Sequence, residues 1–192
     1  IRRGLPPEIG DFSVSPYRVI QFDKSDPSLI CLKMERVGYV QTKLGERLLT
    51  IEKTMNFSQH SNSVHVHYHF RNRSDAPITG VLGVEFNWNI DGHFGSDRYL
   101  QFENDYRRIG LRRSGEETNV SCMVWRLGGA TTQLKTSIPV NVVYYPNEVP
   151  IMTLDGYDMA FQGMCSIVMF DINLWGGETM QIELEVVAMK EQ

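Results

Sequence analysis

A strict alternation of apolar and polar residues marks the middle of the chain, between residues 63 and 90. In its first half three histidines separate four apolar side chains, Val64, Val66, Tyr68 and Phe70. The second half, residues 78–90, repeats the alternation. Because successive side chains of a strand point to opposite faces, both halves predict half-buried β-strands. The turn-forming residues between them favour one long antiparallel hairpin.

Shorter apolar runs, separated by turn residues, continue this pattern. The segment 44–57 is compatible with helix by composition, but its period of two favours a strand. Residues 144–157 hold two prolines and no stable period, which predicts a long crossing loop. Besides the central pair and residues 44–57, strands are expected at residues 17–22, 29–40, 99–102, 106–111, 120–127, 133–143, 161–174 and 180–187.

The number of expected strands decides the fold class. About ten to thirteen strands are too many for one open sheet, so the pattern predicts an all-β fold, a large antiparallel β-sandwich of two facing sheets. The 192 residues suit one sizeable core, and residues 1–192 are expected to form a single domain. The first residue is Ile1 rather than Met, which indicates a piece of a longer chain.

Composition excludes some partners. A net charge of -4 gives no electrostatic reason to expect nucleic acid or an anionic membrane. No apolar run approaches the roughly 20 residues of a membrane span. Three separated cysteines form no C-x-x-C pair and leave one thiol over in any disulfide scheme, which favours free thiols in the cytoplasm. No cofactor is expected.

The histidine row on the first central strand is a candidate metal site. Alternate strand residues lie about 6.6–6.8 Å apart, so His65 and His67 could share one metal ion. Further ligands would have to come from other strands, and the sequence does not say which of Glu52, Glu85, Asp91 or His93 are adjacent. A wet polar strand face is the favoured interpretation, and no metal is assigned.

The polar face of the second central strand is a candidate sugar-binding surface. Glu85, Asn87 and Asn89 form a row of a carboxylate and two amides, which suits sugar hydroxyls because these need both donors and acceptors. Outward residues of an amphipathic strand would look the same. Trp175, in a Gly-Gly turn, is the best candidate for an exposed aromatic platform. Together with His93, these residues make up the candidate carbohydrate-binding set.

Acid-base chemistry would need two titratable groups in one cleft. His93 with Glu85, or Asp155 with Asp158, are conceivable pairs, but neither has a diagnostic spacing. No nucleophile elbow, H-E-x-x-H or phosphate-binding glycine loop is present. No catalytic residue is assigned.

Two segments resemble a known family. The runs VHVHYHFRNRS and GVLGVEFNWNI resemble a hairpin in the C-terminal β-sandwich of the 4-α-glucanotransferases and α-amylases of glycoside hydrolase family 57. The resemblance covers residues 64–187 and continues at Tyr145-Pro146, Gly156-Tyr157, Phe161-Gln162-Gly163 and Gly177-Glu178.

The resemblance implies that catalysis takes place on a different domain. In such enzymes an N-terminal (β/α) barrel carries two catalytic carboxylates, and the C-terminal domain is a large supersandwich similar to mutarotases. This chain lacks the alternating β and α pattern of a barrel, so no catalytic residue carries over. The implied function is a non-catalytic accessory domain of an α-glucan-active hydrolase or glucanotransferase, which supports the barrel and contacts oligosaccharide. An aldose epimerase-like or metal-assisted carbohydrate enzyme and a structural interaction module are the alternatives.

Overall fold

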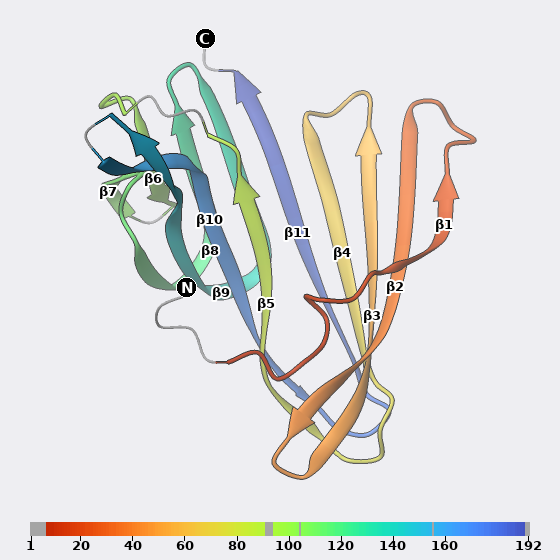
Figure 1. The fold of residues 1–192 in the computed structure, drawn as a ribbon. Coiled ribbons are helices and arrows are strands. Elements are labelled where there is room, and N and C mark those ends of the chain that lie inside the picture. Colours follow the sequence, from red (N-terminus) through yellow and green to blue (C-terminus); the bar gives the residue numbers. More distant parts are fainter. Residues whose placement is uncertain (1–6, 91–93, 104, 155, 191–192) are drawn as a thin grey trace. The chain divides into compact units, whose positions relative to one another are not determined.

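The computed structural model describes residues 7–90, 94–103, 105–154 and 156–190. These residues form eleven strands and no helix, which confirms the all-β prediction (Figure 1). That part of the chain therefore holds no helix able to cross a membrane. The strands are β1 (Arg18–Asp23), β2 (Leu29–Thr42), β3 (Gly45–Ser58), β4 (Ser63–Asn72), β5 (Ile78–Trp88), β6 (Arg98–Phe102), β7 (Asp105–Gly110), β8 (Gly115–Leu127), β9 (Ala130–Thr153), β10 (Gly156–Leu174) and β11 (Thr179–Lys190).

The chain folds as two compact units. Unit 1 comprises residues 1–80 and 171–183, and unit 2 comprises residues 81–170 and 184–192. Strands β5, β10 and β11 therefore each begin in one unit and end in the other. Neither unit is a continuous segment of the sequence.

Unit 1 is a run of neighbouring strands in the order β1-β2-β3-β4-β11. Strand β2 pairs with β3 in one unbroken antiparallel register, from Leu29 opposite Ser58 to Thr42 opposite Gly45. Gly45 has a φ of 98°, a left-handed conformation that glycine adopts without a steric penalty and that closes the turn. The strand interpretation of residues 44–57 is confirmed.

The alternation along β4 separates a dry face from a wet one, as predicted. Val66, Tyr68 and Phe70 are buried, whereas the histidines between them are exposed or half-buried. The Tyr68 and Phe70 rings stack with centroids 5.9 Å apart. The other large buried side chains of unit 1 come from its remaining strands and their ends, and include Val40, Leu49, Ile51, Ile78, Ile172, Leu174 and Ile182.

Unit 2 is built around the long strand β9. On one edge β9 pairs with β8, and on the other it pairs first with β11 and then with β10. Strands β6 and β7 extend the sheet beyond β8, and β5 pairs with β10. Trp88 on β5 and Trp125 on β8 meet with ring centroids 5.7 Å apart although their strands are not neighbours in the sheet. Their contact therefore spans the interior between two layers, as a sandwich requires.

The prediction that the two central strands pair with each other as a hairpin is wrong. Strand β4 has β3 and β11 as neighbours, while β5 pairs with β10. The buried side chain of Asn72 lies at the end of β4. Its Nδ2 atom donates to the carbonyl oxygens of Ala76, Leu174 and Trp175 at 2.8, 2.9 and 3.1 Å. These bonds fix the end of β4 against the turn between β10 and β11.

The predicted loop at residues 144–157 is also wrong. Strand β9 continues to Thr153, and β10 begins at Gly156 in an antiparallel register with it. Pairing of β9 with β8 reaches only as far as Tyr144, so Pro146 and Pro150 lie where β9 has one strand partner in the described structure. Proline cannot donate a ladder hydrogen bond, and edge positions tolerate it.

Candidate functional site

The polar row on β5 is a hydrogen-bonded unit within unit 2. Glu85, Asn87 and Asn89 are exposed, as predicted. The amide nitrogen of Asn87 donates to Glu85 Oε1 at 3.0 Å, and Asn147 donates its own amide hydrogen to Asn87 Oδ1 at 2.9 Å. The two bonds fix which end of the Asn87 amide faces each neighbour, so the row presents donors and acceptors in a set order.

Gly163 allows this row to form. It pairs with Asn147 on β9 and lies at an irregularity in the register of β10. A side chain here would collide with the carbonyl oxygen of Trp88, and its φ of 138° is unfavourable for other residues. Because Gly163 has no side chain, β5 can approach β10 closely. Asn87 on β5 and Asn147 on β9 then lie within hydrogen-bond distance from either side of β10.

Asn147 was missed by the sequence analysis because it fell in the predicted loop. An asparagine between two prolines gives no strand signal, and nothing in its neighbours points to β5. His93, Asp91 and Asp155 lie outside the described residues. The acid-base pairs suggested for His93 with Glu85 and for Asp155 with Asp158 therefore stay predictions.

Trp175 lies in unit 1, whereas the β5 row lies in unit 2. Its side chain is 62% exposed, which confirms its predicted exposure. The backbone beneath the ring is fixed: the Trp175 amide donates to Glu178 Oε2 at 2.8 Å, and its carbonyl oxygen accepts from Asn72. An exposed ring on a fixed turn can serve as an apolar platform.

His67 and His69 of β4 line a polar depression of about 250 Å³ in unit 1, together with side chains of β2, β3 and β11. His67 Nδ1 lies 3.2 Å from Glu183 Oε1, and His65 Nε2 lies 3.2 Å from the Ser63 hydroxyl. Glu52 forms an ion pair with Lys33. Among the described residues no group of three His, Cys, Asp or Glu side chains is arranged to hold a metal ion. The suggested sharing of a metal by His65 and His67 finds no third ligand in that part of the chain.

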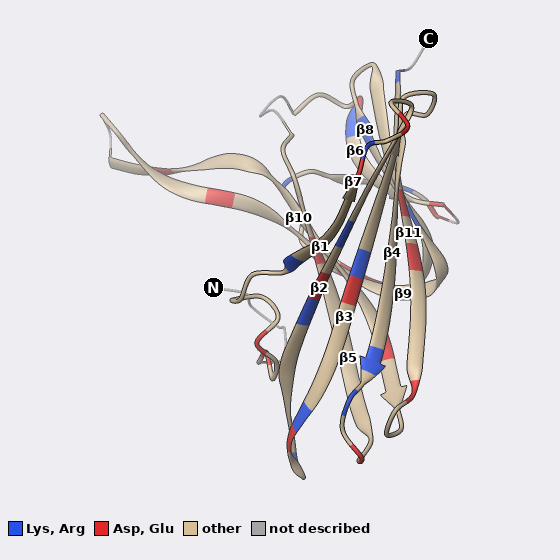
Figure 2. Cartoon of the chain, turned by 90° about the vertical axis from the view of Figure 1, so that its right-hand side faces the viewer, with Lys and Arg blue, Asp and Glu red and all other residues tan. Residues whose placement is uncertain are grey.

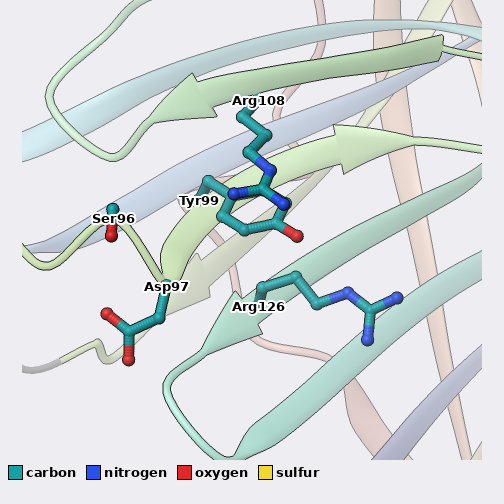
Figure 3. A pocket seen from close by; sticks show the side chains of 5 residues that line it. All are labelled: Ser96, Asp97, Tyr99, Arg108 and Arg126. Carbon is teal, nitrogen blue, oxygen red and sulfur yellow. The ribbon is translucent and has the colours of Figure 1, made fainter.

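A second depression, of about 280 Å³, lies in unit 2 and was not foreseen (Figure 3). The Arg108 guanidinium lies over the Tyr99 ring, 4.7 Å from its centroid, which is a cation-π geometry. Arg126 reaches the same depression and donates to the Thr131 hydroxyl at 3.1 Å. Figure 3 shows the Asp97 carboxylate turned away from both guanidinium groups. The depression is shallow and its lining is mostly polar.

Several solved structures share this fold. The 4-alpha-glucanotransferase from Thermococcus litoralis is 15% identical, has a TM-score of 0.68 and is matched over 93% of this chain. A putative aldose 1-epimerase from Escherichia coli K12 is 9% identical, with a TM-score of 0.57, over 94% of this chain and 70% of its own. A galactose mutarotase-like protein from Clostridium acetobutylicum is 10% identical, with a TM-score of 0.60, over 92% of this chain and 67% of its own.

These likenesses confirm the predicted fold, an antiparallel sandwich of the mutarotase type, and at such identities they show the fold alone. This chain spans 23% of the length of the Thermococcus litoralis protein. No curated protein matches it. A family profile described as alpha-amylase/4-alpha-glucanotransferase, C-terminal, matches residues 2–184. Because that match extends over nearly all of the sequence, the chain belongs to the alpha-amylase/4-alpha-glucanotransferase family, as its C-terminal domain.

Proposed function

We propose that this chain is a non-catalytic accessory domain of an α-glucan-active enzyme, and that a catalytic barrel precedes it in the same polypeptide. The family match over residues 2–184 carries this proposal. The length of the Thermococcus litoralis 4-alpha-glucanotransferase, of which this chain spans 23%, supports it, because a separate catalytic part fits in the remainder. The domain would stabilise that part and help to hold its substrate.

We further propose that the β5 row contacts sugar hydroxyls. Asn87, tied to Glu85 on one side and to Asn147 on the other, offers a preset array of donors and acceptors. A ligand hydroxyl therefore meets groups that need no reordering, which lowers the entropic cost of binding. Asn89, directly after the end of β5, is also exposed. Trp175 offers a separate contact in unit 1, an apolar ring for a sugar face.

Titration of maltooligosaccharides, followed by calorimetry and by tryptophan fluorescence, tests these contacts. Asn87→Ala removes the middle of the row and is expected to weaken binding about fivefold, the equivalent of about 1 kcal/mol for one hydrogen bond. Asn141→Ala is the matched control, because Asn141 is an exposed asparagine of β9 in the same unit. Trp175→Ala is expected to weaken binding without lowering stability.

Unchanged affinity in both Asn87→Ala and Trp175→Ala would contradict the proposed sugar contacts. Unfolding of Trp175→Ala would show that the ring has a structural role. Catalysis of glucose mutarotation by the wild-type chain would favour the epimerase-like alternative, for which His67 and Glu183, 3.2 Å apart, are one described pair of acid and base.

We also propose a cytoplasmic location. Cys31, Cys122 and Cys165 form no disulfide bond in the described structure, which is compatible with a reducing compartment. Burial raises the pKa of the Cys122 thiol, and the nearby Glu103 carboxylate acts in the same direction. Cys122 is therefore mostly protonated and unreactive at neutral pH.

A further inference from the structure

Trp175 places a large aromatic ring on the surface of unit 1. The residue is 62% exposed, whereas Leu174 directly before it is buried. Its backbone is held on both sides, because the Trp175 amide donates to Glu178 and the Trp175 carbonyl accepts from Asn72. Exposure of so large an apolar ring to water is unfavourable, so a ligand that covers the ring gains binding free energy.

The strand that leads to Trp175 adds polar side chains on the same face. Asp171 and Asn173 of β10 are exposed. Ile172 and Leu174, which alternate with them, are buried, and Trp175 continues this alternation directly after the strand. By the two-residue period of a strand, Asp171, Asn173 and Trp175 therefore share the outward face, with about 6.6–6.8 Å between neighbours. A sugar ring placed on Trp175 can thus extend a hydroxyl group to Asn173.

A hydrogen bond from a second strand orients the Asn173 amide. The Thr79 hydroxyl on β5 donates to Asn173 Oδ1 at 3.2 Å. This bond leaves the Asn173 Nδ2 hydrogens on the side away from Thr79 as donors, while the Thr79 oxygen keeps its capacity to accept. Asp171 adds a carboxylate, which only accepts when ionised. The face beside Trp175 therefore offers both donors and acceptors, as sugar hydroxyls require.

The polarity of these neighbours favours a sugar over a protein partner. The core of a protein interface is apolar and depleted of charged residues. On the outward face beside Trp175, by contrast, Asp171, Asn173 and Thr79 are all polar and exposed. One apolar ring next to hydrogen-bonding groups suits a sugar, because a pyranose has an apolar C–H face and a hydroxyl-bearing edge.

The distribution of charge favours an uncharged ligand. Figure 2 shows red segments beside blue ones along β2 and β3 of unit 1. Lys33 on β2 and Glu52 on β3 neutralise each other in an ion pair. Asp171, on the same face as Trp175, is negative and disfavours a ligand that carries phosphate or carboxylate groups.

We propose that Trp175, Asn173 and Thr79 form one subsite for a neutral pyranose ring of an α-glucan, with Asp171 at its end. This inference rests on the proposed function, which supplies the glucan. It deepens the contact proposed for Trp175, because it assigns the groups that bind the hydroxyls and places them in the same unit as the ring. The Trp175 ring covers the C–H face of the sugar, and the Asn173 amide donates to a hydroxyl at the sugar's edge. Thr79 is a positioning residue that orients this amide.

Acrylamide quenching of tryptophan fluorescence, with and without maltotriose, tests the subsite. Trp175 dominates the quenching, because Trp125 is 0% exposed and Trp88 is half-buried. Maltotriose is expected to protect the wild type. Asn173→Ala is expected to raise the maltotriose concentration for half-protection about fivefold, the effect of one lost hydrogen bond. Asn141→Ala is the matched control, because Asn141 is an exposed asparagine on another strand, and it is expected to leave that concentration unchanged.

Two further comparisons test the roles within the subsite. Thr79→Val removes the bond to Asn173 and is expected to cause a smaller loss of affinity, whereas Thr79→Ser keeps the hydroxyl and is expected to retain wild-type affinity. Urea midpoints check that both variants are folded. In a Trp175→Ala background, followed by calorimetry, Asn173→Ala is expected to change affinity less than in the wild type, because both groups hold the same sugar ring.

Equal affinity in the wild type and in Asn173→Ala, together with a loss in Trp175→Ala, overturns the subsite and leaves the proposed Trp175 contact intact. Independent losses in the double variant also overturn it, in favour of two separate contacts. Protection by glucose 1-phosphate equal to that by maltotriose overturns the preference for a neutral ligand. Absence of any protection overturns the subsite, whereas protection in a complete polypeptide that lacks activity on α-glucans contradicts the proposed function alone.

Discussion

Strands β9 and β10 pass through two opposite environments within unit 2. In their proximal part, Val142 opposite Val168 and Tyr144 opposite Ser166 are almost fully buried. In their distal part, which comprises residues 147–154 and 156–162 and is called the arm here, Met152 and the opposite Tyr157 are largely exposed. The antiparallel pairing is the same in both parts, and both are rich in apolar residues.

The difference shows that strand pairing and burial have separate causes. The proximal part of β9 is flanked by β8 as well as β10, and Trp88 on β5 donates its indole hydrogen to Ser166 at 2.8 Å. The arm has the pairing without these additional strands. Hydrogen bonds between two strands thus define the backbone of the arm, while further layers decide which apolar side chains are buried.

The largest loss of stability is expected from truncating Trp88, the side chain that covers the proximal part of β9 and β10. Trp88→Ala should lower the free energy of unfolding by about 3–5 kcal/mol, because the ring packs on Phe86 and Trp125 and its loss leaves a cavity. Urea denaturation measures the change. A loss below about 1 kcal/mol would mean that this layer contributes little to the burial of β10.

Two methionines in the same strand pair give a direct comparison. Met164 is 0% exposed, and Met164→Ala should cost about 2–5 kcal/mol. Met152 is 77% exposed, and Met152→Ala should stay within about 0.5 kcal/mol in the isolated domain. Equal losses in urea denaturation would show that the arm is packed in solution and would remove the contrast between the two parts.

Gly163 lies at the junction of the two parts. Gly163→Ala should cost about 1–3 kcal/mol, because the position has a φ of 138° and the new methyl group would meet the Trp88 carbonyl. Gly129→Ala is the control: Gly129 also has a positive φ, of 99°, but open space around it. Urea midpoints are expected to fall further for Gly163→Ala, and the reverse order would contradict the close approach of β5 and β10.

The smallest expected effect is a change in the pH dependence of stability. Burial raises the pKa of Tyr144, with Glu117 and Asp105 adding to the shift and Arg107 opposing it. A raised folded-state pKa means that stability is full below the unfolded value of about 10 and declines as the pH rises above it. Tyr144→Phe should flatten this alkaline decline, and Tyr157→Phe, which removes an exposed hydroxyl, is the matched control. Thermal melts between pH 8 and 11 measure both, and identical curves for all three proteins would contradict the assignment.

The sequence was sufficient where a local period decides the structure. The alternation along β4 predicted its buried Val66, Tyr68 and Phe70, and the period of two identified β3 despite its helix-forming residues. The Gly-Gly turn predicted an exposed Trp175. These features depend on residues within one strand or turn, so short-range patterns capture them.

The sequence was insufficient where distant residues decide the outcome. The partners of β4 and β5 are distant in the sequence, and the bonds that fix the end of β4 join Asn72 to Leu174 and Trp175 about a hundred positions later. Pro146 and Pro150 suggested a loop. Strand β9 tolerates them because its pairing with β8 ends before them, and the sequence does not show where that pairing ends. For the same reason Asn147, which completes the β5 row, gave no signal.

The discontinuity of the two units has a consequence for synthesis on the ribosome. Within this domain residues 1–80 emerge before the rest, but unit 1 also needs residues 171–183, whose translation comes about ninety residues later. Strand β4 therefore leaves the exit tunnel long before β11, its neighbour in the sheet, exists. The early strands must wait with one edge unpaired, and closing so long a loop slows folding.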